Sequence, residues 1–189
     1  MRQFFTSVLE VIEVALIALG AVFFIRSFLV QPFLVSGASM VPTFLNDDYL
    51  LVDELTYRLR SPARGEVVVF RYPKDESTYF IKRIIGLPGD RIEIKSGNVV
   101  VFDAASPAGT ALAEEYLPPG TVTVPRSGDA SAFTLRASEY LVLGDNRSYS
   151  FDSRDWGVLA KHEIIGLVRL RLWPLSGFTV FAAPQYEAR

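Results

Sequence analysis

Hydrophobic residues are distributed very differently over the two ends of this 189-residue chain. Residues 8–30 form one long apolar stretch, whereas the later part holds short apolar runs bounded by glycine, proline and polar residues. A long run is typical of a helix that crosses a membrane, and short runs separated by turn residues are typical of β-strands. The pattern therefore predicts a single N-terminal transmembrane helix followed by a mainly β domain.

The predicted membrane span covers residues 8–30 and follows a short N-terminal segment, residues 1–7. As a helix it would measure about 34 Å, slightly more than the bilayer core of about 30 Å. Its three charges, Glu10, Glu13 and Arg26, lie toward its ends, where long side chains reach the interface at low cost. A cleaved secretory signal is the alternative, although its leader would be interrupted by two glutamates. Loop charge does not orient the helix.

Residues 31–189 are predicted to form the β-rich domain. Residues 73–76 are expected to connect a hairpin, and residues 87–90, which include Pro88 and Gly89, to form a turn. Residues 104–137 are rich in Ala, Gly, Pro, Ser and Thr, which favours a variable surface insertion over a lobe that contacts substrate. The expected strands are residues 49–52, 66–72, 79–85, 91–94, 98–102, 139–143 and 164–172.

Composition excludes several kinds of chemistry. The chain has no cysteine, which excludes thiol proteases and thiolate metal sites. It has one histidine, His162, whose charged neighbours indicate a surface position, so neither a metal nor a cofactor is expected. A net charge of −2 without a basic stripe argues against nucleic acid as a partner.

A serine and a lysine are the candidate catalytic pair. A serine hydroxyl is a weak nucleophile that needs a nearby base, and Ser39 lies in a short polar segment directly after the apolar stretch. Lysine acts as a base only when its pKa of about 10.4 falls by roughly three units, which burial achieves. In a strand over residues 79–85, Lys82 would share one face with Phe80 and Ile84. The alternative is a lysine that extends to solvent from an ordinary strand.

Residues 143–157 combine acids, amides, hydroxyls and two arginines between glycines. Such a loop requires dense internal hydrogen bonding, and Asp152 with Arg154 could form a charge-assisted pair that holds it. A turn that only links two strands is the alternative.

These segments together resemble bacterial type I signal peptidases, membrane-anchored serine proteases with a Ser/Lys dyad, and the resemblance covers most of the chain. The serine motif of the family is similar to residues 36–43, and its lysine motif is similar to residues 82–90. Residues 64–70 resemble the strand between these motifs, and residues 144–154 resemble the last box. Residues 172–175 resemble the usual ending.

The resemblance implies that Ser39 attacks the scissile carbonyl while Lys82, neutral in the free enzyme, accepts its proton. It also implies that Ser150 orients the Lys82 amine and that Met40 helps to form the pocket floor. Supporting roles are implied for Asp145, Asp152 and Arg154.

The oxyanion hole is the open part of this mechanism. The backbone N–H of Ser39 is one candidate donor. Some family members carry a serine two positions before the nucleophile, but Gly37 stands there in this chain. The second donor is therefore a backbone group, a water molecule or the Ser36 hydroxyl.

The resemblance implies a protein of the bacterial plasma (inner) membrane with a cytoplasmic N-terminus and an extracytoplasmic catalytic domain. Its implied partners are the lipid bilayer and exported preproteins, which it cleaves after small residues in an A-x-A-like pattern. A monomer is expected. Two alternatives are a self-cleaving repressor-type Ser/Lys protease and a catalytically silent, membrane-tethered binding domain.

Overall fold

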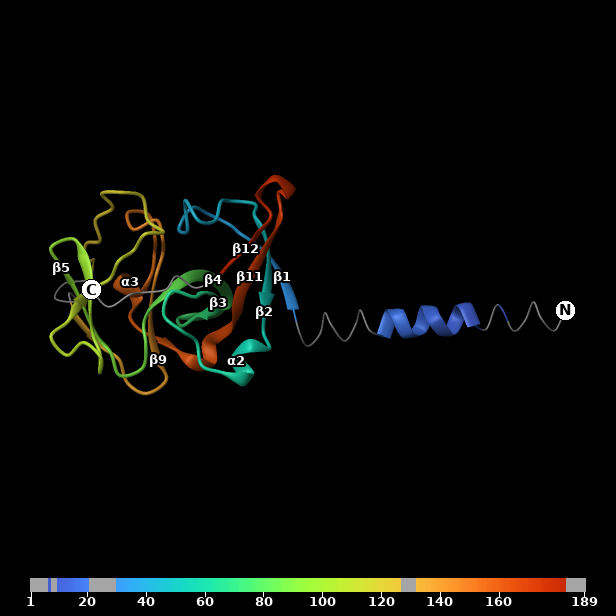
Figure 1. Cartoon of the computed structure of the whole chain (residues 1–189), viewed down its shortest axis with the longest axis horizontal. Helices are drawn as coiled ribbons and strands as arrows, with labels where there is room; N and C mark the ends of the chain where they lie inside the picture. Colours follow the sequence, from blue (N-terminus) through green and yellow to red (C-terminus); the bar gives the residue numbers. More distant parts are fainter. Residues whose placement is uncertain (1–6, 8–9, 21–29, 127–131, 183–189) are drawn as a thin grey trace.

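The computed structural model describes residue 7 and residues 10–20, 30–126 and 132–182. Residues 10–20 form a helix, drawn in blue in Figure 1, and the described residues from Val30 onward form a β-rich body. Within these ranges, no helix combines the length and the apolar character needed to cross a membrane. The predicted span of residues 8–30 includes residues 8–9 and 21–29, which lie outside the described residues, as do residues 1–6. The end of the predicted span is wrong by one residue, because Val30 pairs with Asp53 as the first residue of a strand.

The mainly β prediction is confirmed, and a strand forms at each of the seven expected places. These are β2 (Tyr49–Asp53), β3 (Val67–Tyr72), β4 (Asp75–Gly86), β5 (Arg91–Lys95), β6 (Asn98–Phe102), β9 (Glu139–Leu143) and β11 (Ile164–Trp173). Sequence patterning did not predict the shorter elements. These are β1 (Val30–Leu34), β7 (Thr110–Ala111), β8 (Ala132–Thr134), β10 (Leu159–Ala160), β12 (Thr179–Val180), the helices α2 (Thr56–Leu59) and α3 (Ser153–Trp156), and the 3₁₀ turns η1 (Lys161–Glu163) and η2 (Leu175–Gly177).

The strands form two sheets. The larger sheet has the order β1-β2-β11-β3-β4-β9-β10, with β12 added beside β11. The smaller sheet has the order β7-β6-β5-β8 and lies at the end of the molecule away from the N-terminal helix (Figure 1). Residues 104–137 supply β7 and β8, so part of the expected insertion belongs to this second sheet.

Strand β4 is the central element for the site. It pairs antiparallel with β3 through a connection of only two residues, Pro73 and Lys74, which confirms the expected hairpin. After β4 the chain turns at residues 87–90, where the Asp90 N–H donates to the Leu87 carbonyl and Gly89 has a φ of 89°. The turn is therefore the expected one, and its glycine adopts an angle that other residues rarely reach.

Strand β4 also has one partly open edge. Its partner β9 begins to pair only at Arg83, so β9 leaves residues 79–82 unpaired on that side. Strand β1 lies at the end of the larger sheet and pairs with β2 alone. An open edge next to the functional residues can accept another extended chain.

Three apolar clusters form the core. The first lies under β1, β2 and β11 and includes Met40 and Phe44 from the loop after β1. The second lies between β3, β4 and β9 around Trp156, and the third joins the end of β4 to the smaller sheet. The loop that carries Ser39 is thus anchored in the core on both sides of the serine, by Val35 and by Met40.

Candidate active site

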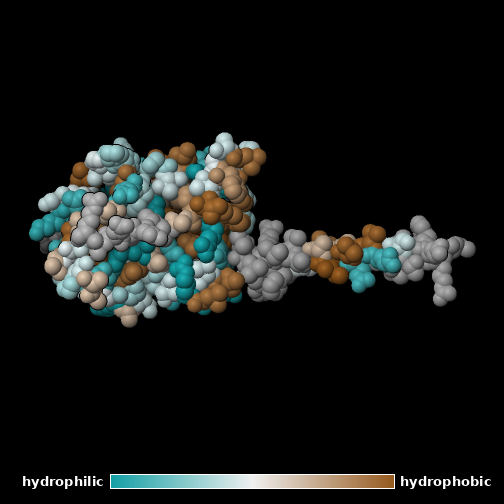
Figure 2. Space-filling model, in the orientation of Figure 1, coloured by the Kyte–Doolittle hydropathy of each residue, from teal (hydrophilic) through white to brown (hydrophobic). Residues whose placement is uncertain are grey.

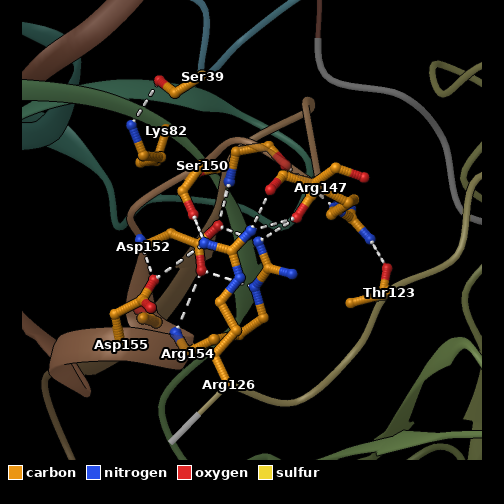
Figure 3. A network of polar contacts seen from close by, with 12 residues as sticks. Ser39, Lys82, Thr123, Arg126, Arg147, Ser150, Asp152, Arg154 and Asp155 are labelled. Carbon is orange, nitrogen blue, oxygen red and sulfur yellow. Dashed lines mark hydrogen bonds and ion pairs between the residues drawn. The ribbon is translucent and has the colours of Figure 1, made fainter.

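Lys82 lies in the middle of β4 and is almost fully buried, with 3% of its surface exposed. Strand alternation places it on the same face as Phe80 and Ile84, and its Nζ lies 5.3 Å from the centre of the Phe80 ring. Its Nζ donates to the Ser39 Oγ over 2.8 Å and to the main-chain carbonyl of Ile81 over 2.8 Å. The predicted burial of Lys82 is confirmed, and the two residues of the predicted dyad are in direct contact (Figure 3).

Burial lowers the pKa of Lys82 to about 8 from its ordinary value of 10.5, although the carboxylates of Asp152 and Asp145 oppose this change. With this pKa, roughly one amine in ten is neutral at pH 7, against fewer than one in a thousand for an exposed lysine. A neutral amine has a free lone pair that can accept the proton of a serine hydroxyl. The site therefore supplies a base without histidine, and His162 is exposed, as its charged neighbours predicted.

The loop after β1 presents Ser39 to the lysine. Asn146 holds the backbone of this loop: its N–H donates to the Ser39 carbonyl over 3.0 Å, and its side-chain amide donates to the Ala38 carbonyl over 3.0 Å. Met40, the next residue, is buried in the core. Because these contacts use carbonyl groups, the Ser39 backbone is held while its hydroxyl remains directed toward Lys82.

Asp145 and Arg83 form a buried ion pair beneath the dyad. Arg83 donates to both carboxylate oxygens of Asp145, over 2.9 and 2.6 Å, and also to the Gly65 carbonyl over 2.8 Å. Thr43, in the serine loop, donates its hydroxyl to Asp145 over 2.5 Å. One carboxylate therefore connects the serine loop, β4 and the loop that follows β9.

Asp152 and Arg154 form a second, fully buried pair, as predicted. The guanidinium contacts both carboxylate oxygens over 2.8 Å, and the Gly144 N–H donates to Asp152 over 3.0 Å. Burial by itself raises the pKa of Asp152, but the hydrogen bonds and the charge of Arg154 outweigh that effect and hold the pKa below its ordinary value. Asp152 also caps the N-terminus of α3. Because Asp152 accepts the Gly144 N–H as well, the Asp152–Arg154 pair holds both ends of residues 144–152.

The role expected of Ser150 stays a prediction. Its hydroxyl was predicted to orient the Lys82 amine, but Lys82 directs its described hydrogen bonds to Ser39 and Ile81. The Ser150 side chain lies close enough to Asp152 for a polar contact that helps to lower the carboxyl pKa, but among the described residues its buried Oγ makes no hydrogen bond of regular geometry. A buried hydroxyl without a partner costs roughly 1 to 3 kcal/mol, which is unusual unless the group has another use.

Gly144 explains how closely Ser150 approaches the nucleophile. A Cβ at position 144 would lie 2.1 Å from the Ser150 Oγ and 2.5 Å from the Ser39 carbonyl oxygen. Both atoms therefore pack against the same face of this glycine. Only a residue without a side chain allows the Ser150 hydroxyl and the serine loop to meet here.

The region of the expected oxyanion hole has an unexpected contact. Gly37 has a φ of 97°, and its N–H donates to the Asn46 side chain over 2.8 Å. The Gly37 N–H is therefore already engaged, which makes it a poor second donor. Ser36 and Ser39 both line the cavity beside the dyad. The Ser36 hydroxyl therefore stays a candidate for the second oxyanion donor.

A cavity of about 330 Å³ opens beside Ser39 and Lys82. The chain segments that flank it are residues 33–39 on one side and residues 79–82 on the other. Its remaining walls come from Leu50 and Val69 of the core and from Tyr149 and Phe151 of the loop after β9. The dyad therefore lies in the lining of a mostly apolar cavity that is bounded by residues 79–82, at the open edge of β4.

Residues 104–137 support the site in a way that the sequence did not predict. Arg147 is buried, and its guanidinium contacts Glu114 and the Thr123 hydroxyl, both from this segment. Arg126, also from this segment, reaches the carbonyls of residues 147–150 (Figure 3). Isolated charged residues in a segment otherwise rich in Ala, Gly, Pro and Ser were the available signal, but sequence spacing does not reveal their partners.

The family model of signal peptidases, peptidase S26, matches residues 8–173. The chain belongs to the signal peptidase family. Removal of signal peptides by a serine endopeptidase is therefore its activity, and the resemblance drawn from the motifs is confirmed.

Curated relatives from several bacteria agree. "Signal peptidase I P" of Bacillus subtilis subsp. natto is 36% identical over 177 residues, which cover 90% of this chain and 92% of the relative. "Signal peptidase IB" of Staphylococcus aureus is 33% identical over 184 residues, with coverage of 90% and 92%. "Probable signal peptidase I-2" of Synechocystis sp. is 37% identical over 156 residues, or 80% of this chain and 66% of that protein. A crystal structure of a signal peptidase I from Enterococcus faecalis gives a TM-score of 0.46 at 27% identity, covering 57% of this chain and 97% of that one.

Proposed function

We propose that this signal peptidase cleaves exported preproteins with Ser39 as nucleophile and Lys82 as general base. The observation that carries the proposal is the 2.8 Å contact between the Lys82 Nζ and the Ser39 Oγ. Lys82 accepts the hydroxyl proton as the Ser39 Oγ bonds to the scissile carbonyl carbon. The resulting ammonium then protonates the leaving amine, which releases the mature protein and leaves an acyl-enzyme.

Deacylation uses the same groups. Lys82, neutral again, removes a proton from a water molecule that attacks the ester carbon, and the proton then returns to the Ser39 oxygen as the ester bond breaks. The free signal peptide leaves with a new carboxylate. The Lys82 amine carries the transferred protons in both acylation and deacylation. Its burial lowers its pKa, which lets it do so in a site without histidine.

Ser150 has a physical role in this cycle that matches its unpaired hydroxyl. An ammonium has three donors, of which two are directed to the Ser39 Oγ and the Ile81 carbonyl. The Ser150 Oγ, which packs against the serine loop at Gly144, accepts the third when Lys82 becomes protonated. Asp145, Asp152 and Arg154 keep these groups in place.

The oxyanion that develops on the scissile carbonyl requires two donors. The Ser39 N–H supplies the first, and the Ser36 hydroxyl supplies the second, since Asn46 already occupies the Gly37 N–H. Removing one such donor lowers the turnover number by about 10²- to 10³-fold in other enzymes.

The cavity indicates how substrate binds. An extended peptide can add as a strand along the open edge of residues 79–82 and face residues 33–38 on its other side. Main-chain hydrogen bonds would then provide affinity for any sequence. The limited apolar volume beside the dyad accepts small side chains before the cut, which supports cleavage after A-x-A-like sequences.

We further propose that a single transmembrane helix lies within residues 8–29, since Val30 begins β1, with residues 1–7 in the cytoplasm and the β-rich domain outside. Exposed apolar side chains support contact between the catalytic domain and the lipid bilayer, and Figure 2 shows apolar surface on the side where β1 and β12 lie. These exposed residues are Leu34, Trp173, Leu175, Phe178 and Val180. The enzyme acts as a monomer in the bacterial plasma membrane.

The dyad is tested by cleavage of a purified preprotein in liposomes. Ser39→Ala and Lys82→Ala should each lower the turnover number by at least about 10³-fold, because either change removes a group that acts only in the transition state. His162→Ala is the matched control and should cleave at the wild-type rate. Wild-type activity in either dyad variant would refute the assignment.

A further inference from the structure

Residues 145–150 are a loop without regular secondary structure, yet they carry two contacts on which the chemistry depends. Near the start of the loop, Asn146 holds the backbone of Ala38 and Ser39. At the end of the loop, Ser150 brings its hydroxyl close to the same backbone. Loops are generally more mobile than strands. The Asp152–Arg154 pair holds part of this loop, with Arg154 donating to the Arg147 carbonyl over 2.8 Å, and a second device can hold the rest.

Arg126 makes the contacts that such a device requires. Its guanidinium donates to three main-chain carbonyls of the loop, those of Arg147 over 3.0 Å, Ser148 over 2.6 Å and Ser150 over 2.6 Å. It also lies 3.6 Å from the Asp155 carboxylate, which balances its charge. Three quarters of the side chain is buried. The guanidinium thus holds the loop directly at the residue that carries the Ser150 hydroxyl.

We propose that Arg126 is a positioning residue for catalysis, which acts by fixing Ser150 relative to Lys82 and Ser39. This inference rests on the proposed roles of the dyad and of Ser150. Among the residues that the structure describes, the hydrogen bonds and the ion pair of Arg126 reach main-chain carbonyls of the loop and the carboxylate of Asp155, so we expect its effect on the reaction to pass through the loop geometry. A displacement of about 1 Å in a reacting group can cost about 10²-fold in rate, so a modest shift of the loop would be measurable.

Arginine suits this position better than other residues. Its planar fork carries five N–H donors and can serve several carbonyls at once, whereas lysine is a point charge with three donors. Asp155 also accepts the main-chain N–H of Asp152 over 3.0 Å. The same carboxylate therefore links Arg126 to the buried Asp152–Arg154 pair and to the start of α3. Residues 104–137, expected to be a surface insertion, thereby complete the support of the active site.

The test is a double-mutant cycle measured by steady-state cleavage of a preprotein with the full chain in liposomes. Arg126→Gln should lower the turnover number by about 5- to 20-fold and change KM by less than that factor, because the edge of β4 is not altered and the loop contributes only Tyr149 and Phe151 to the cavity wall. In a Ser150→Ala background the same change should lower the turnover number by less than about twofold, because the group that Arg126 positions is gone. Arg126→Lys should recover part of the loss.

Arg136→Gln is the matched control, because Arg136 is an exposed arginine of the same segment. It should leave the turnover number and KM unchanged. Thermal unfolding of each variant shows whether a loss of activity reflects loss of folded protein. If Arg126→Gln does not accumulate, Arg126→Lys replaces it in the cycle, with a smaller loss of turnover number that should likewise disappear in the Ser150→Ala background.

Two results would overturn the proposal. Wild-type turnover in Arg126→Gln would show that the loop is held without the guanidinium. An equal loss in the wild-type and Ser150→Ala backgrounds would show that Arg126 acts by a route other than Ser150. Neither result affects the dyad assignment, which fails only if Ser39→Ala or Lys82→Ala retains activity.

Discussion

At the scale of single residues, the burial of Lys82 is the property that makes the chemistry possible, and it has a cost in stability. Lowering its pKa from 10.5 to about 8 corresponds to roughly 3 kcal/mol of folding free energy at pH 7. Between these two pKa values the unfolded chain binds more protons than the folded one. Stability therefore rises with pH across this window, and the cost is greatest below pH 8.

The same pKa predicts the pH dependence of catalysis. Protonation removes the lone pair of Lys82, so kcat/KM for preprotein cleavage should fall as pH decreases below about 8, by about tenfold per unit, and should level off at higher pH. The profile is measured with a substrate that has no titratable residue near the cleavage site. A flat profile between pH 6 and 9 would contradict the role of Lys82 as base.

At the scale of secondary-structure elements, β4 provides two adjacent residues with opposite tasks. Lys82 faces the cavity as the proposed base, while Arg83, on the other face, binds Asp145 and so joins β4 to the loop after β9. This pair is almost fully buried, with side-chain exposures of 5% and 0%. A buried charge that loses its partner is strongly destabilising, whereas an exposed pair contributes little.

Two arginines of the larger sheet allow this contrast to be tested. Arg83→Ala should reduce the free energy of unfolding by about 3 to 5 kcal/mol, because it leaves the buried Asp145 carboxylate without its partner. Arg169→Ala, which breaks the partly exposed contact with Asp53, should cost less than about 1 kcal/mol. Urea unfolding of both variants in detergent, followed by tryptophan fluorescence, measures the difference. Equal losses would show that the Arg83 pair has no special structural role.

At the scale of the whole molecule, the apolar surface and the N-terminal end lie on the same side of the β-rich body (Figures 1 and 2). A helix anchored in the bilayer would therefore bring Trp173 and Phe178 toward the lipid. The cavity is bounded by β1 residues on this same side. Such an arrangement would place the dyad close to the membrane surface, where the end of a signal helix emerges.

The proposed topology can be tested with introduced cysteines, because the chain has none of its own. In spheroplasts, a membrane-impermeant maleimide should label Lys74→Cys, in the exposed hairpin connection, without permeabilisation. Gln3→Cys should be labelled only after the membrane is opened. Labelling of both in intact spheroplasts, or of Gln3→Cys alone, would refute a cytoplasmic N-terminus.

Much of the fold could be predicted from the pattern of apolar residues, because strands such as β4 and β9 combine a buried run with turn residues at their ends. The shorter elements could not. Strand β1 carries Pro32 and follows a long apolar stretch, so nothing in its local pattern separates it from the predicted helix. Strands such as β7 and β12 contain only two residues and exist because a longer partner strand lies beside them.

The sequence by itself determined the family and the mainly β architecture and predicted the dyad, because motif order and strand alternation are local properties. Only the tertiary structure decided how the site is supported. The Asn46 contact to Gly37, the unpaired Ser150 hydroxyl and the reach of Arg126 across more than twenty residues to the catalytic loop depend on which segments fold against each other. Hydrogen bonds of this kind join residues that are distant in the chain, and a single sequence does not encode their pairing in any local pattern.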